Sequence, residues 1–177
     1  MANNIPAEEY YLRQALLLVW NNQYNRLASV NAEHATARLI TNLLLQGRPT
    51  EAEVIARTYL LGNIDPNYKR SMTKPLLTNG LAESLYAQNR LEEAEYAARL
   101  SLTIHANICS SQDGIPHTKA RRTLIRILAA RGDWQSVQSL KTEIKLALSK
   151  NPDRYQQLYG ANPNFLLADI LSSRNSQ

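Results

Sequence analysis

The chain has 177 residues, a formal net charge of +5 and one cysteine, and 44% of its residues are hydrophobic. This length supports one domain with a sizeable core, and the lone Cys109 excludes an internal disulfide framework and a cysteine-based zinc cluster. Six glycines and one phenylalanine against many leucines and alanines favour helix over sheet.

The first predicted helix covers residues 5 to about 22. Pro6 suits a first helical turn, and Glu8 and Glu9 lie where the helix dipole favours anions. We expect a helix that packs at the end of an array through a broad apolar side, made by Tyr11, Leu12, Ala15, Leu16, Leu18 and Val19. The alternative is an exposed aromatic patch, made by Tyr10, Tyr11, Trp20 and Tyr24.

The same region predicts neither a membrane span nor a secretory signal. Its longest apolar run, Ala15 to Trp20, is much shorter than the roughly 20 residues that a spanning helix needs. It lacks the basic flank and the small-residue cleavage site of a signal peptide. We expect a cytoplasmic protein, with a mature periplasmic protein as the alternative.

Three similar turns recur between residues 31 and 150. Residues 46–53 read QGRPTEAE and residues 88–95 read QNRLEEAE, so that Ala52 and Ala94 are 42 residues apart. In the third turn, residues 130–137 read ARGDWQSV, and Val137 takes the alanine position 43 residues further on. A steady period of this kind indicates stacked helical hairpins.

The hairpins follow from the helical spacing on both sides of each turn. We predict helices over residues 31–46, with Asn31 as N-cap, over 49–61, and on both sides of Asn89 within residues 80–102. Small residues at one face of the last helix let a neighbouring helix approach closely; they are Ala94, Ala98 and Ser101. Residues 62–73 and 103–117 are predicted to link the hairpins.

These hairpins resemble tetratricopeptide repeats. In the second hairpin the resemblance rests on Ala82, Asn89, Ala94, Ala98, Ser101 and Leu102, and in the first on Leu39, Leu43, Gly47, Ala52, Ala56 and Leu60. The third matches at Leu124, Leu128, Gly132 and Val137, whereas Lys141 there and Tyr59 in the first hairpin replace small residues. The period exceeds the usual 34 residues of that family.

The order of segments is also similar to the repeat region of bacterial proteins that carry a CHAT protease domain after their tetratricopeptide repeats. That resemblance includes the closing segment 151–171, NPDRYQQLYGANPNFLLADIL. It implies a stand-alone relative or an excised regulatory repeat region of a larger protein, and it brings no catalytic residue to this sequence.

The predicted fold is therefore an all-α, right-handed solenoid of about three tetratricopeptide-like hairpins. We expect one domain over residues 1–177, with an N-terminal capping helix (1–30), three hairpins (31–150), and C-terminal capping helices with a polar tail (151–177). The capping helices are predicted over about 151–159 and 162–171, opened by Asn-Pro at each start.

The sequence predicts no enzyme and no cofactor. It has no Gly-rich phosphate loop, no nucleophile elbow and no His-Glu-x-x-His pair. His105 and Cys109 are four residues apart, with His117 downstream, which is compatible with a metal site or a Cys–His nucleophile. We favour the simpler interpretation, a link with a buried thiol and solvated histidines.

Binding is the predicted activity, in a groove lined by the first helix of each hairpin. The inward positions are His34, Ala37, Thr41, Leu44 and Leu45 in the first hairpin, Leu76, Asn79, Glu83 and Tyr86 in the second, and Lys119, Arg122 and Arg126 in the third. Such a groove is apolar at one end and basic at the other, which suits a partner protein or peptide with an acidic portion. We take Asn79, Glu83, Tyr86, Lys119, Arg122 and Arg126 as the candidate site.

Two other partners are weighed. Nucleic acid would bind through the basic face of the third hairpin, at Lys119, Arg121, Arg122, Arg126 and Arg131. A second copy of the chain would pack on the aromatic N-terminal helix, which would make a self-association scaffold.

Overall fold

The computed structural model describes residues 5–21, 26–62, 73–108 and 115–150. These residues form seven α-helices and contain no β-strand, which confirms the all-α class. The helices are α1 (Ile5–Asn21), α2 (Arg26–Leu45), α3 (Pro49–Gly62), α4 (Lys74–Ala87), α5 (Leu91–Ile108), α6 (Ile115–Ala130) and α7 (Trp134–Lys150).

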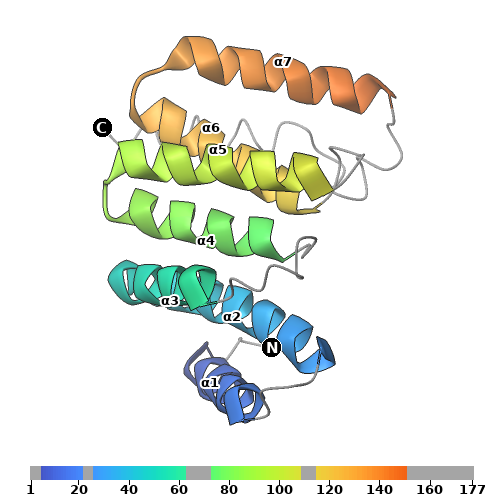
Figure 1. Ribbon diagram of the computed structural model, residues 1–177. Helices are drawn as coiled ribbons and strands as arrows, with labels where there is room; N and C mark the ends of the chain where they lie inside the picture. Colours follow the sequence, from blue (N-terminus) through green and yellow to red (C-terminus); the bar gives the residue numbers. More distant parts are fainter. Residues whose placement is uncertain (1–4, 22–25, 63–72, 109–114, 151–177) are drawn as a thin grey trace.

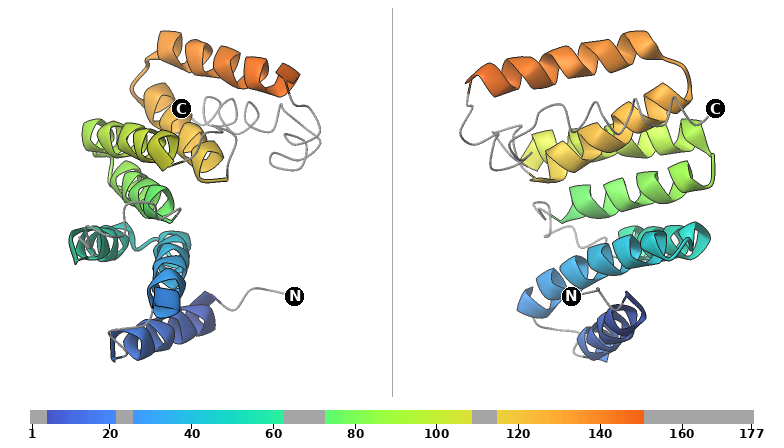
Figure 2. Two further views of the ribbon diagram at one scale, coloured as in Figure 1. Left: turned by 45° about the vertical axis from the view of Figure 1, so that its right-hand side comes forward. Right: turned by 180° about the vertical axis from the view of Figure 1, so that it is seen from behind.

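The helices are stacked in chain order, from α1 at one end to α7 at the other (Figure 1). Each helix packs against the next along the chain, and α4 also contacts both α2 and α6. The helices α2, α4 and α6 therefore form a row, and α3 and α5 lie to one side of it (Figure 2, left).

The three predicted turns share one backbone geometry. Gly47, Asn89 and Gly132 have φ angles of 70°, 59° and 78°. This left-handed region favours Gly and tolerates Asn, which explains the residue types at these positions. In each turn the next amide donates to a carbonyl five residues back: Arg48 to Leu43 (2.9 Å), Arg90 to Leu85 (3.0 Å) and Asp133 to Leu128 (2.9 Å).

Carboxylates tie the first two turns to the helix that precedes their hairpin. The side chains of Gln46 and Arg48 both donate to Oε2 of Glu9 in α1, at 2.7 Å. The same two positions of the second turn donate to Glu53 in α3. Thus α1 contacts the first turn as α3 contacts the second.

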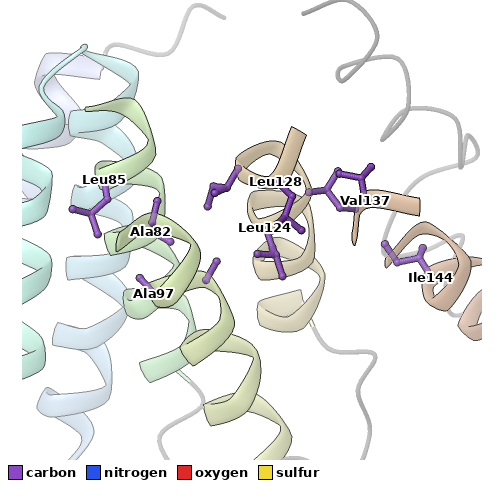
Figure 3. Close-up of a cluster of buried hydrophobic side chains, with 11 residues drawn as sticks. Ala82, Leu85, Ala97, Leu124, Leu128, Val137 and Ile144 are labelled. Carbon is purple, nitrogen blue, oxygen red and sulfur yellow. The ribbon is translucent and has the colours of Figure 1, made fainter. Parts of the chain in front are cut away.

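Two clusters of buried side chains form the core. The first joins α1 to α4 through Leu12, Leu39, Ile40, Leu43, Ala52, Ala56 and Leu77. The second joins α4 to α7, and Figure 3 shows its side chains, among them Ala82, Leu85, Ala97, Leu124, Leu128, Val137 and Ile144. Both clusters consist of aliphatic residues, mostly Leu and Ala, at helical spacing, so the core follows the apolar pattern of the sequence.

Small residues set the distances between helices, as the sequence predicts. Ala94, Ala98 and Ser101 of α5 are fully buried, and the Ser101 hydroxyl donates to the Pro75 carbonyl oxygen of α4 at 2.6 Å. Gly80 gives the closest approach, because a Cβ there would lie 2.9 Å from Cγ2 of Ile40 in α2.

Several predicted boundaries were wrong. Helix α2 begins at Arg26 and not after Asn31, because the apolar spacing continues upstream through Leu27 and Val30. Helix α5 runs to Ile108, through the predicted link, because neither Gly nor Pro occurs between Leu102 and Ile108. The predicted C-terminal helices lie outside the described residues.

The apolar side predicted for α1 is narrower than expected. Leu12 is buried and Leu16 packs beside it, but Tyr11 is 70% exposed and Tyr10 60% exposed. The two rings contact each other edge to face, with centroids 5.5 Å apart. An exposed tyrosine pair therefore stands on α1, as the alternative interpretation expected.

Candidate binding groove

A groove of about 330 Å³ crosses α2, α4 and α6. Eight of its lining residues are predicted inward positions: His34, Ala37, Thr41, Leu45, Leu76, Asn79, Glu83 and Lys119. The other four are Glu8, Arg38, Asn42 and Gly80. The groove exists because α4 contacts both α2 and α6, so that one side of each helix faces a common space.

An exposed leucine and an ion pair between Arg38 and Glu8 lie at the α2 end of the groove. Leu45 is 69% exposed, and the half-buried Leu76 of α4 also lines the groove. Arg38 donates to Oε1 of Glu8 at 2.6 Å, and the Asn42 amide donates to Oε2 at 3.2 Å. These hydrogen bonds, first that from Arg38, hold the pKa of the Glu8 carboxyl below its usual value. Both oxygens of the Glu8 carboxylate therefore already accept hydrogen bonds within the chain.

The centre of the groove is polar. The Asn79 amide donates to Oε1 of Glu83 at 3.2 Å, and the Thr123 hydroxyl of α6 lies 3.1 Å from the same oxygen. Asn79 is buried, and its Oδ1 has no hydrogen-bond partner. Glu83 thus links α4 to α6 and fixes the floor of the groove.

The α6 end is basic. Lys119, Arg122 and Arg126 are exposed and lie on one face of α6, at the spacing i, i+3 and i+7. The Arg126 guanidinium lies over the Tyr86 ring of α4, 4.8 Å from its centroid. This cation–π contact holds Arg126 at the edge of the groove without removing its charge.

The six candidate residues occupy two adjoining places. Asn79, Glu83 and Lys119 line the groove itself. Arg122 lies one helical turn beyond Lys119, and Arg126 lies two turns beyond it, over the ring of Tyr86 in α4. Leu44, predicted to point inward, instead packs against the first core cluster, because one face of α2 is buried against α1 and α3.

Sequence reasoning missed two charged residues of the groove. Arg38 lies one helical turn after His34, so its position on the same face could have been recognised from spacing. Glu8 belongs to α1, and its contact with Arg38 spans 30 residues. Such a long-range contact leaves no signal in one sequence.

His105 and His117 are not solvated link residues, and that expectation was wrong. Both are buried, and their rings are stacked, with centroids 5.1 Å apart and an interplanar angle of 24°. The reason is that α5 continues past His105, so that the two histidines meet where α5 packs on α6. Cys109, the third residue of that motif, lies outside the described residues.

The His105 ring is chemically unusual. Neither of its nitrogens has a hydrogen-bond partner. Burial, and secondarily the positive charge of Arg121, lower the pKa of His105. The ring is therefore neutral at pH 7. Among the described residues no three His, Cys, Asp or Glu side chains are grouped to hold a metal ion.

The fold leaves fewer of the basic residues predicted to bind nucleic acid available at the surface. Arg121 is only 6% exposed, so its guanidinium does not belong to the surface. Arg131 pairs with Glu95 of α5. Lys119, Arg122 and Arg126 are exposed on one face of α6, and Lys119 lines the groove.

No protein-family model, curated protein or solved structure matches this chain. Within the described helices, no segment has both the length and the apolarity of a membrane span.

Proposed function

We propose that this chain is a non-catalytic interaction module that binds a segment of a partner protein in the groove across α2, α4 and α6. The observation that carries the proposal is the groove itself, which joins an exposed leucine on α2 to Lys119 on α6, with Arg122 and Arg126 exposed further along the same face of α6. Its length over three helices suits an extended peptide or a helix better than a small molecule.

We further propose that the helices form a right-handed solenoid of three tetratricopeptide-like hairpins, preceded by α1 as a cap. Three observations support this proposal. The turns repeat one geometry, small residues recur at the helix contacts, and α2, α4 and α6 contact one another in order.

The chemistry of the groove favours a partner segment with an apolar residue followed by an acidic stretch. The apolar residue would pack on Leu45 and Leu76, and the carboxylates would face Lys119 and Arg126. Glu8 repels such a segment little, because it is ion-paired with Arg38. Glu83 is hydrogen-bonded to the neutral Asn79 amide and Thr123 hydroxyl and keeps its charge, so the acidic stretch is expected to lie toward the cations of α6 and away from Glu83. The charged end then contributes to orientation and association rate as well as to affinity.

Nucleic acid is the weaker candidate. A phosphate backbone requires a broad array of free cations. Arg121 is buried and Arg131 is paired, so the basic face of the third hairpin offers a short row on α6.

Selection from a displayed random-peptide library tests the proposal. We expect enriched peptides to combine an apolar residue with acidic residues. Lys119→Glu should weaken the selected peptide by about tenfold or more. Lys141→Glu, the same charge reversal on α7 away from the groove, is the matched control. Arg122→Glu combined with Arg126→Glu should have at least the effect of Lys119→Glu.

Two results would contradict the assignment. One is the absence of any enriched peptide. The other is equal affinity of wild type and Lys119→Glu for the enriched peptide.

A further inference from the structure

The outer helices carry exposed apolar side chains that the groove does not use. Val54 and Leu61 of α3 are 58% and 71% exposed, and Tyr96 and Leu100 of α5 are 72% and 39% exposed. Neither α3 nor α5 contributes a residue to the groove. The apolar side chains therefore belong to a separate surface, on the side of the molecule where α3 and α5 lie (Figure 2, left).

Each of these helices repeats one pattern of charge around its central apolar residue. In α3, Glu51 lies three residues before Val54 and Arg57 three residues after it. In α5 the same places are held by Glu93, Tyr96 and Arg99. Spacing of three residues keeps each trio on one side of its helix, ordered as negative, apolar and positive.

The two trios form one surface. Arg57 Nη2 of α3 lies 3.6 Å from Glu93 Oε2 of α5, so the two helices are neighbours there. The charged side chains of the trios are between 38% and 54% exposed and reach the edge of the patch. We call Val54, Leu61, Tyr96 and Leu100, with the four charged residues of the trios, the outer patch.

We propose that the outer patch is the interface of a two-fold homodimer in which each outer helix packs antiparallel on the same helix of a second copy. Antiparallel pairing brings Val54 against the partner's Val54 and Tyr96 against the partner's Tyr96. It also places Glu51 opposite the partner's Arg57, and Glu93 opposite the partner's Arg99. The surface is self-complementary, as a two-fold interface requires.

Charge selects this arrangement over the parallel one. Parallel pairing would bring carboxylates against carboxylates and guanidinium groups against guanidinium groups, which is unfavourable. Burial of the apolar side chains drives association. The charged residues form the rim. All four are ion-paired within the chain, and these half-exposed pairs can be shared with the partner: Glu51 with Arg13 and Arg48, Arg57 with Glu53, Glu93 with Arg90, and Arg99 with Glu95.

Sedimentation of the full chain across the micromolar range tests the proposal. We expect wild type to dimerise, and Val54→Ser combined with Tyr96→Ser to raise the dimer dissociation constant by about tenfold or more. Leu45→Ser is the matched control, because it removes an equally exposed leucine from the groove; it should dimerise like wild type. Circular dichroism verifies that each variant is helical.

A charge exchange decides the matter even if the serine variant does not fold. Glu51→Arg with Glu93→Arg gives an all-basic patch, and Arg57→Glu with Arg99→Glu gives an all-acidic one. Each should be monomeric alone, and an equimolar mixture should form a heterodimer.

Three outcomes would overturn the proposal: a monomeric wild type, a folded serine variant that dimerises like wild type, or a mixture that stays monomeric. Peptide binding to the groove is measured separately, so either proposal can fail without the other.

Discussion

The second and third turns each contact the helix that precedes their hairpin. The acceptor stands at the same position of that helix in both cases, but the donors differ. In the second turn, Gln88 and Arg90 donate to Oε2 of Glu53 at 2.8 and 2.7 Å. In the third, Arg131 alone donates from the turn to Glu95, which stands 42 residues after Glu53. Arg131 occupies the position that corresponds to Gln88.

The position that corresponds to Arg90 has a new use in the third turn. Asp133 stands there, and its Oδ1 accepts the backbone amide of Ser136 at 3.1 Å, which caps the start of α7. Hydrogen bonds from the side chain and then the backbone of Ser136 lower the pKa of Asp133. The contact between an outer helix and the next turn therefore needs a carboxylate on that helix and one long donor side chain in the turn. The donor can occupy different positions in the turn.

The largest expected effect in this comparison concerns the leucine that lies four residues before the Asn or Gly residue of each turn. Leu85 and Leu128 hold corresponding buried positions before the second and third turns. Leu85→Ala and Leu128→Ala should each lower the free energy of unfolding by about 2–5 kcal/mol, measured in urea. We expect hydrogen exchange to show lost protection around α4 and α5 in the first variant and around α6 and α7 in the second. Identical exchange patterns would mean that the two hairpins unfold as one unit.

A smaller effect on the free energy of unfolding is expected when Glu53 or Glu95 is replaced. Glu53→Ala removes a largely buried acceptor that Gln88, Arg90 and Arg57 share, and it should cost about 1–3 kcal/mol of unfolding free energy. Glu95→Ala frees only Arg131 and Arg99, which regain water, and should cost about 1 kcal/mol or less. The exposed Glu92→Ala is the control for a loss of charge on α5. A larger loss for Glu95→Ala than for Glu53→Ala would reverse the comparison.

The sequence could predict the parts of this fold that depend on local spacing. The positive-φ residues, the buried alanines of α5 and most of the inward positions of α2 and α4 follow from periodicity within one helix or one turn. Helix ends were harder, because the absence of a breaker after Leu102 is a weaker signal than the presence of one.

Contacts between distant residues could not be predicted. The Arg38–Glu8 pair of the groove and the stacking of His105 on His117 depend on how whole helices pack. The burial of Arg121 is of the same kind, since its neighbours in sequence are exposed at Arg122 and Arg126. A charged residue in a basic stretch gives no local sign that it faces the interior.

The junction of α5 and α6, which includes His105, should be sensitive to acid. The folded state lowers the pKa of His105, whereas the unfolded chain has the ordinary value near 6.5. Stability is therefore complete above about pH 6.5 and falls as the pH drops from there toward the folded pKa, by up to about 1.4 kcal/mol per pH unit. Thermal melts from about pH 7.5 to about pH 5.5 should show this slope in wild type and in the exposed His34→Gln variant. His105→Leu should remove it, and an unchanged slope in that variant would assign the effect elsewhere.

The smallest expected effect compares the turn residues themselves. Asn89 has φ of 59° and Gly132 has φ of 78°, and nothing lies within 4 Å of a Cβ added at Gly132. Asn89→Ala and Gly132→Ala should thus each cost about 1 kcal/mol from backbone strain alone, whereas Asn89→Gly should leave stability within about 0.5 kcal/mol of wild type. Urea titrations can resolve these differences. Equal losses of unfolding free energy at the two sites would mean that the two turns have the same backbone strain. The different donors to Glu53 and Glu95 would then be the feature that distinguishes the second turn from the third. A clearly larger loss at Gly132 would instead mean that the third turn is held more tightly than its single donor indicates.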